Sequence, residues 1–176
     1  MKYLLLFLLI SSQAFAQQQV ESKNVKLNLP NNSIKIDKIG MVENSVSDES
    51  KIQKRYHVNS FPGKKYIGRG VIKFIQFTDT AVTVRPDYIQ YRKKMFDEAS
   101  SGLSGKVPES SSIIRVVNGC EVLIVKWVGD TYVNYIIIST NKSHNKVFNS
   151  RIIALKRDII EADKEVDNFV KNIRFK

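Results

Sequence analysis

Few residues in this sequence of 176 residues have the type and spacing that catalysis or metal binding requires. The two histidines, His57 and His144, lie far apart, and neither has a second ligand type at the spacing of a metal site. The chain also lacks the Gly-x-Ser-x-Gly motif of a serine nucleophile. We therefore predict no catalytic residue, no metal site and no cofactor.

Cys120 is the only cysteine, so it cannot form a disulfide within the chain. A reactive thiolate would need a base or a positive charge nearby. Cys120 instead follows an Asn-Gly turn, and Val117 and Val122 flank it on the same face of a predicted sheet. We interpret Cys120 as a small buried side chain, with a reactive thiol as the alternative.

Carboxylates could still supply acid–base chemistry if two of them meet only in the folded chain. Most Asp and Glu residues lie within residues 43–49 or on two predicted helices, where such side chains usually face solvent. A converging pair would make the protein a hydrolase. The sequence therefore leaves a hydrolase open as the alternative to a protein without catalytic activity.

The first residues have the features of an export signal. Lys2 precedes the apolar residues 3–10, and residues 14–16 (Ala-Phe-Ala) match the small-x-small pattern of a signal peptidase site. The apolar run is shorter than the roughly 20 residues that cross a bilayer. Gln17 stands where a lipid-anchored protein needs cysteine. We predict a signal peptide over residues 1–16, no transmembrane segment in the mature chain, and a periplasmic or secreted location.

The chain is basic, because 28 Lys and Arg residues outnumber 17 Asp and Glu residues and give a net charge of +11. This charge either keeps the surface solvated or attracts an anionic partner. We predict a protein or an anionic envelope component as the partner. The predicted export and the lack of a nucleic-acid motif argue against nucleic acid. The predicted partner-binding residues are Arg92, Lys93, Lys94, Lys106, Lys142 and Lys146.

The first half of the chain predicts short strands joined by polar turns. Residues 17–24 are polar and are predicted to form a flexible N-terminal tail. Residues 25–176 have the length and apolar content of a single α+β domain. Residues 40–50 are predicted to form a loop. Alternating apolar residues predict strands over 25–29, 33–39, 51–58 and 65–78. Residues 80–84 either continue the last of these strands after a break at Asp79 or form another strand.

Apolar residues recur at spacings of three and four in two later segments, which predicts helices over residues 87–99 and 158–173. A long loop rich in Ser and Gly, residues 100–112, follows the first helix. Each helix begins with a pair that resembles a capping box. These pairs are Asp87 with Gln90 and Asp158 with Glu161. The predicted apolar face of the first helix comprises Tyr88, Tyr91, Met95 and Ala99.

The second half predicts an antiparallel meander of four strands. The dipeptides Asn-Gly at 118–119 and Gly-Asp at 129–130 are typical of two-residue hairpin turns, and residues 141–145 form a third turn. Two-residue turns fix which residues face each other across the strands. The predicted pairs include Ile114 with Leu123, Leu123 with Ile136, and Trp127 with Tyr132.

Both faces of this meander carry mostly apolar side chains, so we expect cover on both sides. One face includes Leu123 and Trp127, and the other includes Val122 and Ile124. We predict an α+β fold in which the antiparallel meander is sandwiched between the two amphipathic helices, a three-layer α/β/α arrangement. In the alternative, both helices share one face, and a partner or the N-terminal strands cover the other.

Residues 113–175, which end in a helix and the sequence VDNFVKNIRF, resemble the C-terminal half of the PsbP-like family. The resemblance lies in the order hairpin, strand and closing helix and in the spacing of apolar residues. It implies an antiparallel sheet with flanking helices. It also implies a role in protein binding or assembly without catalysis.

These observations favour an exported, non-enzymatic binding or assembly module of the cell envelope or exterior. A periplasmic inhibitor or immunity-type protein is one form of such a module. The alternative is an envelope hydrolase whose carboxylates converge only in three dimensions. The sequence makes no prediction of the oligomeric state.

Overall fold

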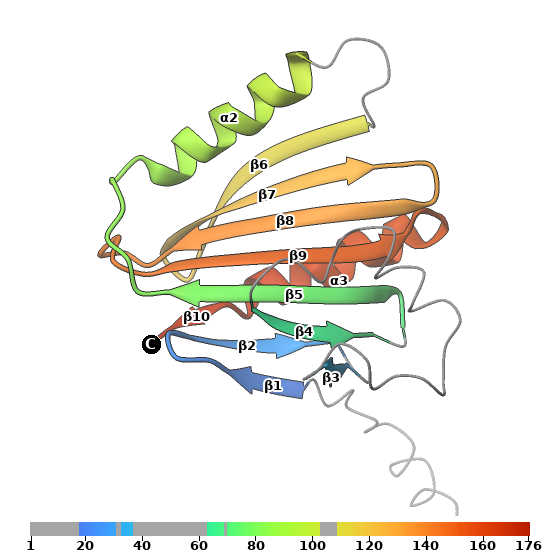
Figure 1. Cartoon of the computed structure of the whole chain (residues 1–176), viewed down its shortest axis with the longest axis horizontal. Helices are drawn as coiled ribbons and strands as arrows, with labels where there is room; N and C mark the ends of the chain where they lie inside the picture. Colours follow the sequence, from blue (N-terminus) through green and yellow to red (C-terminus); the bar gives the residue numbers. More distant parts are fainter. Residues whose placement is uncertain (1–17, 31–32, 37–62, 69, 103–108) are drawn as a thin grey trace, which may run out of the picture.

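The computed structural model of the chain describes residues 18–30, 33–36, 63–68, 70–102 and 109–176. This part of the chain forms two antiparallel sheets, two α-helices and one short 3₁₀ helix (Figure 1). The predicted signal peptide, the loop 40–50 and the strand 51–58 lie outside the described residues.

The larger sheet has seven strands in the order β3-β4-β5-β9-β8-β7-β6. It extends the predicted meander, because β5 pairs with β9 and adds the N-terminal strands to the far side. The strands are β3 (Ile34–Ile36), β4 (Lys64–Ile67), β5 (Ile72–Thr80), β6 (Glu109–Val117), β7 (Cys120–Val128), β8 (Tyr132–Thr140) and β9 (Val147–Leu155).

The smaller sheet joins the two ends of the described chain. It contains β1 (Gln18–Glu21), β2 (Val25–Leu29) and β10 (Arg174–Phe175), with β2 in the middle. The buried side chains of β2 belong to the same core cluster as the helix at the C-terminal end. The segment 17–24, which was predicted as a flexible tail, therefore contains a strand that pairs with β2.

The first hairpin of the meander has the predicted register. Asn118 and Gly119 both adopt positive φ, 54° and 74°, which two-residue hairpin turns require and Asn-Gly readily provides. Val117 pairs with Cys120, and Ile114 pairs with Leu123. Local turn chemistry alone was sufficient to predict this part of the sheet.

The second hairpin differs from the prediction by two residues. The strands close at Val128 and Val133, and the amide N–H of Gly129 donates to the carbonyl oxygen of Tyr132 over 2.9 Å. Trp127 therefore pairs with Asn134, and the predicted pairing of Trp127 with Tyr132 is wrong. A shift of two residues leaves every side chain on its predicted face, because side chains alternate with a period of two.

Residues 65–78 form two strands where one was predicted. β4 ends at Ile67 and β5 begins at Ile72. Gly68 lies at the break between them, where an added Cβ would collide with the carbonyl oxygen of Ile72. A residue without a side chain is therefore needed at this position, close to the register shift between Ile72 and Phe74 at the start of β5.

The C-terminal helix α3 (Ile159–Lys171) follows the predicted apolar spacing. Its buried side chains are Ala162, Val166, Phe169 and Val170. They pack on the sheet face that carries Ile137 and Phe148, in the same core as β2. Asp158 is the N-cap residue, as predicted, and a 3₁₀ turn (Lys156–Asp158) precedes the helix. The capping box itself does not form, because the Asp158 side chain makes no capping hydrogen bond.

The other helix, α2 (Tyr88–Gly102), lies on the opposite face beside β6, β7 and β8 (Figure 1). Its predicted apolar face is wrong: Tyr91 and Met95 are 44% and 47% exposed, and Ile89 is the buried anchor. The predicted capping pair also fails. Asp87 forms an ion pair with Arg85, and Gln90 donates to Glu121.

The predicted three-layer α/β/α sandwich is therefore wrong. On one face, α3 shares its layer with the small sheet, whose strands come from both ends of the described chain. On the other face, α2 packs against β6, β7 and β8, whereas β5 and β9 carry Gln76, Asn149 and Arg151. The predicted cover on both sides rested on the apolar faces of the two hairpins over residues 113–138, which do not include these polar positions.

Candidate functional site

A groove of about 440 Å³ lies on the large sheet beside α2. We call it the sheet groove. Its volume falls in the range of about 300–1,000 Å³ that is usual for small-molecule sites. Its described lining residues come from β5, β7, β8 and β9. They are Gln76, Phe77, Thr78, Trp127, Asn134, Ile136, Asn149, Ser150 and Arg151.

Strand register places the side chains of the sheet groove in rows across the sheet. Gln76 pairs with Lys65 on one side and with Arg151 on the other. Arg151 then pairs with Ile136, and Ile136 with Val125. The row therefore begins with Lys65, Gln76 and Arg151 and ends with the aliphatic side chains of Ile136 and Val125 next to α2.

Arg151 is held within this row by a neighbouring strand. Its Nη2 donates to the Oδ1 of Asn134 over 3.0 Å. Asn134 pairs with Trp127 on β7 and with Ile153 on β9, so its side chain belongs to the same sheet face. Arg151 is half-buried on β9, the middle strand of the large sheet, where a cation is uncommon without a functional or electrostatic reason.

Trp127 forms the wall of the sheet groove nearest to α2. Its ring meets the ring of Phe96 edge to face, with centroids 5.9 Å apart and an interplanar angle of 66°. This arrangement is favourable for aromatic pairs. The indole is half-buried and also lines the groove. Because the sequence contains one tryptophan, its fluorescence reports on this site alone.

The composition of the sheet groove suits binding better than proton transfer. Its described lining contains one guanidinium group, three side-chain amides and no carboxylate, histidine or cysteine. The accessible surface of the groove is mainly carbon. Such a lining can hold an apolar body and orient one polar or anionic group.

A second, smaller hollow of about 250 Å³ lies on the opposite face, between α3 and β6 to β8. We call it the α3 pocket. Asp163 accepts from the hydroxyl group of Tyr135 over 2.8 Å and pairs with Lys126 over 2.7 Å. One turn later, Asp167 forms ion pairs with Arg115 and Lys171. This pocket brings two carboxylates together, as a hydrolase would need.

The carboxylates of the α3 pocket are engaged with cations from the same chain. Hydrogen bonds from Lys171 and Arg115 lower the pKa of Asp167, so this carboxyl group stays ionised at neutral pH. Burial and the hydrogen bond to Asp163 raise the pKa of Tyr135, which stays protonated. Neither group is poised to exchange a proton near pH 7. We interpret the α3 pocket as a polar clamp between α3 and the sheet.

The predicted basic residues on α2 are each engaged within the helix. Arg92 lies over the rings of Tyr88 and Phe96, 5.8 and 5.6 Å from their centroids, and is half-buried. Lys93 pairs with Asp97 over 2.5 Å, and Lys94 lies 3.8 Å from Glu98. Arg92 therefore packs on aromatic rings, whereas the two lysines pair with carboxylates one turn later on the helix.

The other predicted basic residues lie elsewhere. Lys142 is exposed and its side chain lies over Gly119 of the first hairpin. Lys146 donates to the backbone carbonyl oxygen of Lys176. Lys106 lies outside the described residues. The structure does not bring the described members of the predicted set together in one patch with the sheet groove.

Cys120 lies half-buried at the first hairpin. Burial raises the pKa of its thiol, although Lys142 opposes this shift. A raised pKa reduces the thiolate fraction at neutral pH, which is the opposite of what a reactive cysteine requires.

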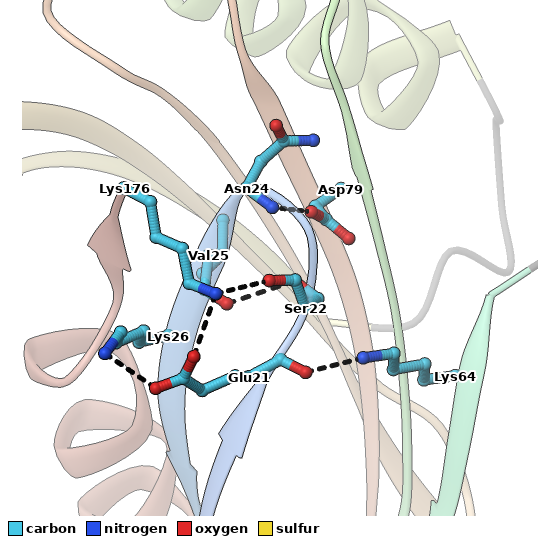
Figure 2. A network of polar contacts seen from close by, with 8 residues as sticks. All are labelled: Glu21, Ser22, Asn24, Val25, Lys26, Lys64, Asp79 and Lys176. Atoms are coloured by element: carbon cyan, nitrogen blue, oxygen red, sulfur yellow. Dashed lines mark hydrogen bonds and ion pairs between the residues drawn. The ribbon is translucent and has the colours of Figure 1, made fainter.

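A polar network fastens the small sheet to the large one (Figure 2). Glu21 pairs with Lys26 over 2.6 Å and with Lys176 over 2.9 Å. Lys64 of the large sheet donates to the carbonyl oxygen of Glu21 over 2.7 Å. The amide N–H of Asn24 donates to Asp79 over 2.6 Å. These contacts connect both ends of the described chain to β4 and β5.

In the described ranges, no three His, Cys, Asp or Glu side chains come together as metal ligands would. Neither described helix combines the length and the apolar character needed to cross a bilayer.

No protein-family model and no curated protein matches this sequence. Among solved structures, the solution structure of cyanobacterial PsbP (CyanoP) from Synechocystis sp. PCC 6803 is similar, with a TM-score of 0.54. The alignment covers 90% of this chain and 92% of that chain at 12% sequence identity. The fold is PsbP-like. The resemblance seen in residues 113–175 is thus confirmed for the fold and extends over most of the chain.

The residues of the sheet groove were not among the predicted binding residues. Gln76 on β5 lies between the buried Ile75 and Phe77, and Asn149 and Arg151 on β9 flank the buried Ser150, so a signal was present in the strand pattern. It appeared as ordinary polar alternation, because only the pairing of β5 with β9 places the three residues side by side.

Proposed function

We propose that the protein is an exported, non-enzymatic binding or assembly module of the cell envelope or exterior, with the sheet groove as its binding site. The observation that carries this proposal is an open, mainly apolar groove with Arg151 and Trp127 among its lining residues. The partner is a protein or an anionic envelope component. An inhibitor or immunity-type protein would use the groove to receive a side chain of the protein that it neutralises.

The ion pairs of the two carboxylates in the α3 pocket favour a binding role over hydrolysis. These carboxylates join α3 to the sheet through Lys126 and Arg115, and Asp167 also pairs with Lys171 within the helix. The charge of the chain, +11, supports an anionic partner. The basic residues Arg92, Lys93, Lys94, Lys106, Lys142 and Lys146 remain our proposed contacts for long-range attraction of such a partner.

The test is affinity capture from the native envelope with the tagged protein and with a variant whose groove is filled. Asn149→Phe places a ring in the sheet groove from the middle of β9. Asn168→Phe, on the exposed side of α3, is the matched control. We expect the wild-type protein and the control to retain a component that the filled variant loses. Identical capture by all three proteins would contradict the proposed site.

The proposed periplasmic or secreted location has its own test. The intact mass of the protein recovered after export should correspond to a chain that starts at Gln17. A retained Met1 would contradict the predicted processing and remove the main support for export.

A further inference from the structure

The sheet groove has a polar end and an apolar end, and this division points to a class of ligand. We propose that it binds an amphipathic carboxylic acid, with the carboxylate at Arg151 and the apolar body against Trp127 and Ile136. The inference rests on the proposed function, because it names the ligand of the same groove.

The polar end lies over β5 and β9. Arg151 supplies a planar, permanently charged group, the type that pairs with carboxylates through two parallel hydrogen bonds. Asn134 fixes one of its nitrogens from the side, at 3.0 Å. Lys65 follows two strands away in the same row, beyond Gln76. Arg151 and Lys65 both bring positive charge to this row, which suits an anionic head group at this end of the groove.

The apolar end lies over β7 and β8, next to α2. Trp127 and Ile136 line it, and the Phe96 ring supports the indole from the helix side. The accessible surface of the groove is mainly carbon. A sugar would need hydrogen-bond partners on most of its sides, and burying its hydroxyl groups here would be unfavourable. An alkyl or aryl body gains from the same surface.

The size of the groove limits the ligand to a small molecule or one side chain. A volume of about 440 Å³ lies near the lower end of the range for small-molecule sites. It accommodates a medium-length chain with one head group. We therefore choose decanoate as the probe, with decanol as the neutral probe of equal chain length.

The experiment titrates the exported, purified protein with each probe below its aggregation concentration and follows the fluorescence of Trp127. Isothermal titration calorimetry gives the stoichiometry. We expect decanoate to bind at one site, shift the emission of Trp127, and bind about tenfold or more tightly than decanol, because a charge-assisted hydrogen bond distinguishes the two.

Three variants separate the charge of Arg151 from other effects. Arg151→Gln should weaken decanoate binding about tenfold or more and leave decanol binding within about twofold. Arg151→Lys keeps the charge but loses the planar pairing, so an intermediate loss is expected. Arg157→Gln, at an exposed site on the 3₁₀ turn, changes the net charge equally and should leave both affinities unchanged. Thermal unfolding of each variant confirms folding.

The possible results separate this inference from the proposed function. Equal binding of decanoate and decanol, or an Arg151→Gln variant that binds decanoate normally, would overturn the anchoring role of Arg151. If neither probe binds but Asn149→Phe still abolishes capture from the envelope, the ligand class is wrong and the groove holds a macromolecule such as an acidic peptide. If neither probe binds and capture does not depend on the groove, both proposals fail.

Discussion

The two hollows lie on opposite faces of one sheet and differ in how their charges are balanced. The α3 pocket contains Lys126 and Arg115 opposite Asp163 and Asp167, so cations and carboxylates occur in equal number. The sheet groove, in its described lining, contains Arg151 and no carboxylate. The ion pairs of the α3 pocket join α3 to the sheet, whereas Arg151 of the sheet groove is the charged group that we propose a ligand contacts. Pocket shape alone would not have distinguished them.

The two faces also differ in what their aromatic residues do. Phe169 on α3 is 2% exposed and packs against Phe148 within the main core. Trp127 is half-buried and pairs with Phe96 at the edge of the sheet groove. The first ring serves packing, whereas the second is available to a ligand.

The largest effect is expected from Phe169→Ala. Removing a buried phenyl ring should lower the free energy of unfolding by about 3–5 kcal/mol, because the lost burial and the cavity both contribute. Urea unfolding measures this loss. Decanoate affinity of the remaining folded protein should change less than twofold. A loss under about 1 kcal/mol would show that α3 is not essential to the core.

Trp127→Ala should lower ligand affinity more, and stability less, than Phe169→Ala. Its half-buried ring and its contact with Phe96 predict a stability loss of about 2–3 kcal/mol, smaller than that of Phe169→Ala. Decanoate binding, measured by calorimetry because the fluorophore is gone, should weaken more than in any other variant that still folds. Unchanged binding would place the ligand away from the indole.

Asp163→Ala tests whether the α3 pocket is a clamp. It leaves the hydroxyl group of Tyr135, a residue 1% exposed, without its acceptor, at a cost of about 1–3 kcal/mol. Adding Tyr135→Phe to this variant should restore part of the stability, because the unsatisfied hydroxyl group is then removed. Comparing unfolding energies of both single variants and the double variant gives the coupling. Zero coupling would contradict the clamp.

The network of Figure 2 predicts a smaller effect that depends on pH. Hydrogen bonds from Lys26 and Lys176 lower the pKa of Glu21 from 4.5 to about 2. Because the folded pKa is the lower one, this contribution is present above pH 4.5 and is lost as pH falls toward 2. The melting temperature of Glu21→Gln should therefore depend less on pH in this window than that of the wild type. Parallel curves would contradict the contribution of Glu21.

The smallest stability effect is expected for the double variant Lys93→Gln, Lys94→Gln. These lysines pair with Asp97 and Glu98 along α2, where ion pairs contribute little to stability. The free energy of unfolding should therefore change by less than about 0.5 kcal/mol. Association with an anionic partner should become slower and less sensitive to salt. Kinetics at two ionic strengths measure this, and unchanged rates at both would remove these lysines from the proposed contacts.

Local sequence determined the parts of this protein that depend on neighbouring residues. Asn118 and Gly119 specified the first hairpin, because few residue pairs adopt positive φ at low cost. The spacing of Ala162, Val166 and Phe169 specified the buried face of α3. Alternation assigned the faces of β7 and β8 correctly, even where the turn between them shifted the register.

Only the tertiary structure decided how these parts combine. The small sheet forms because β2 pairs with β1 and with β10, which lies more than a hundred residues away in the sequence. The sheet groove exists because β5 pairs with β9 and aligns Gln76 with Arg151. Pairing between distant strands depends on the burial of the whole core, and no single segment encodes it. For this reason, the residues of the candidate site could be seen only after the strands were placed.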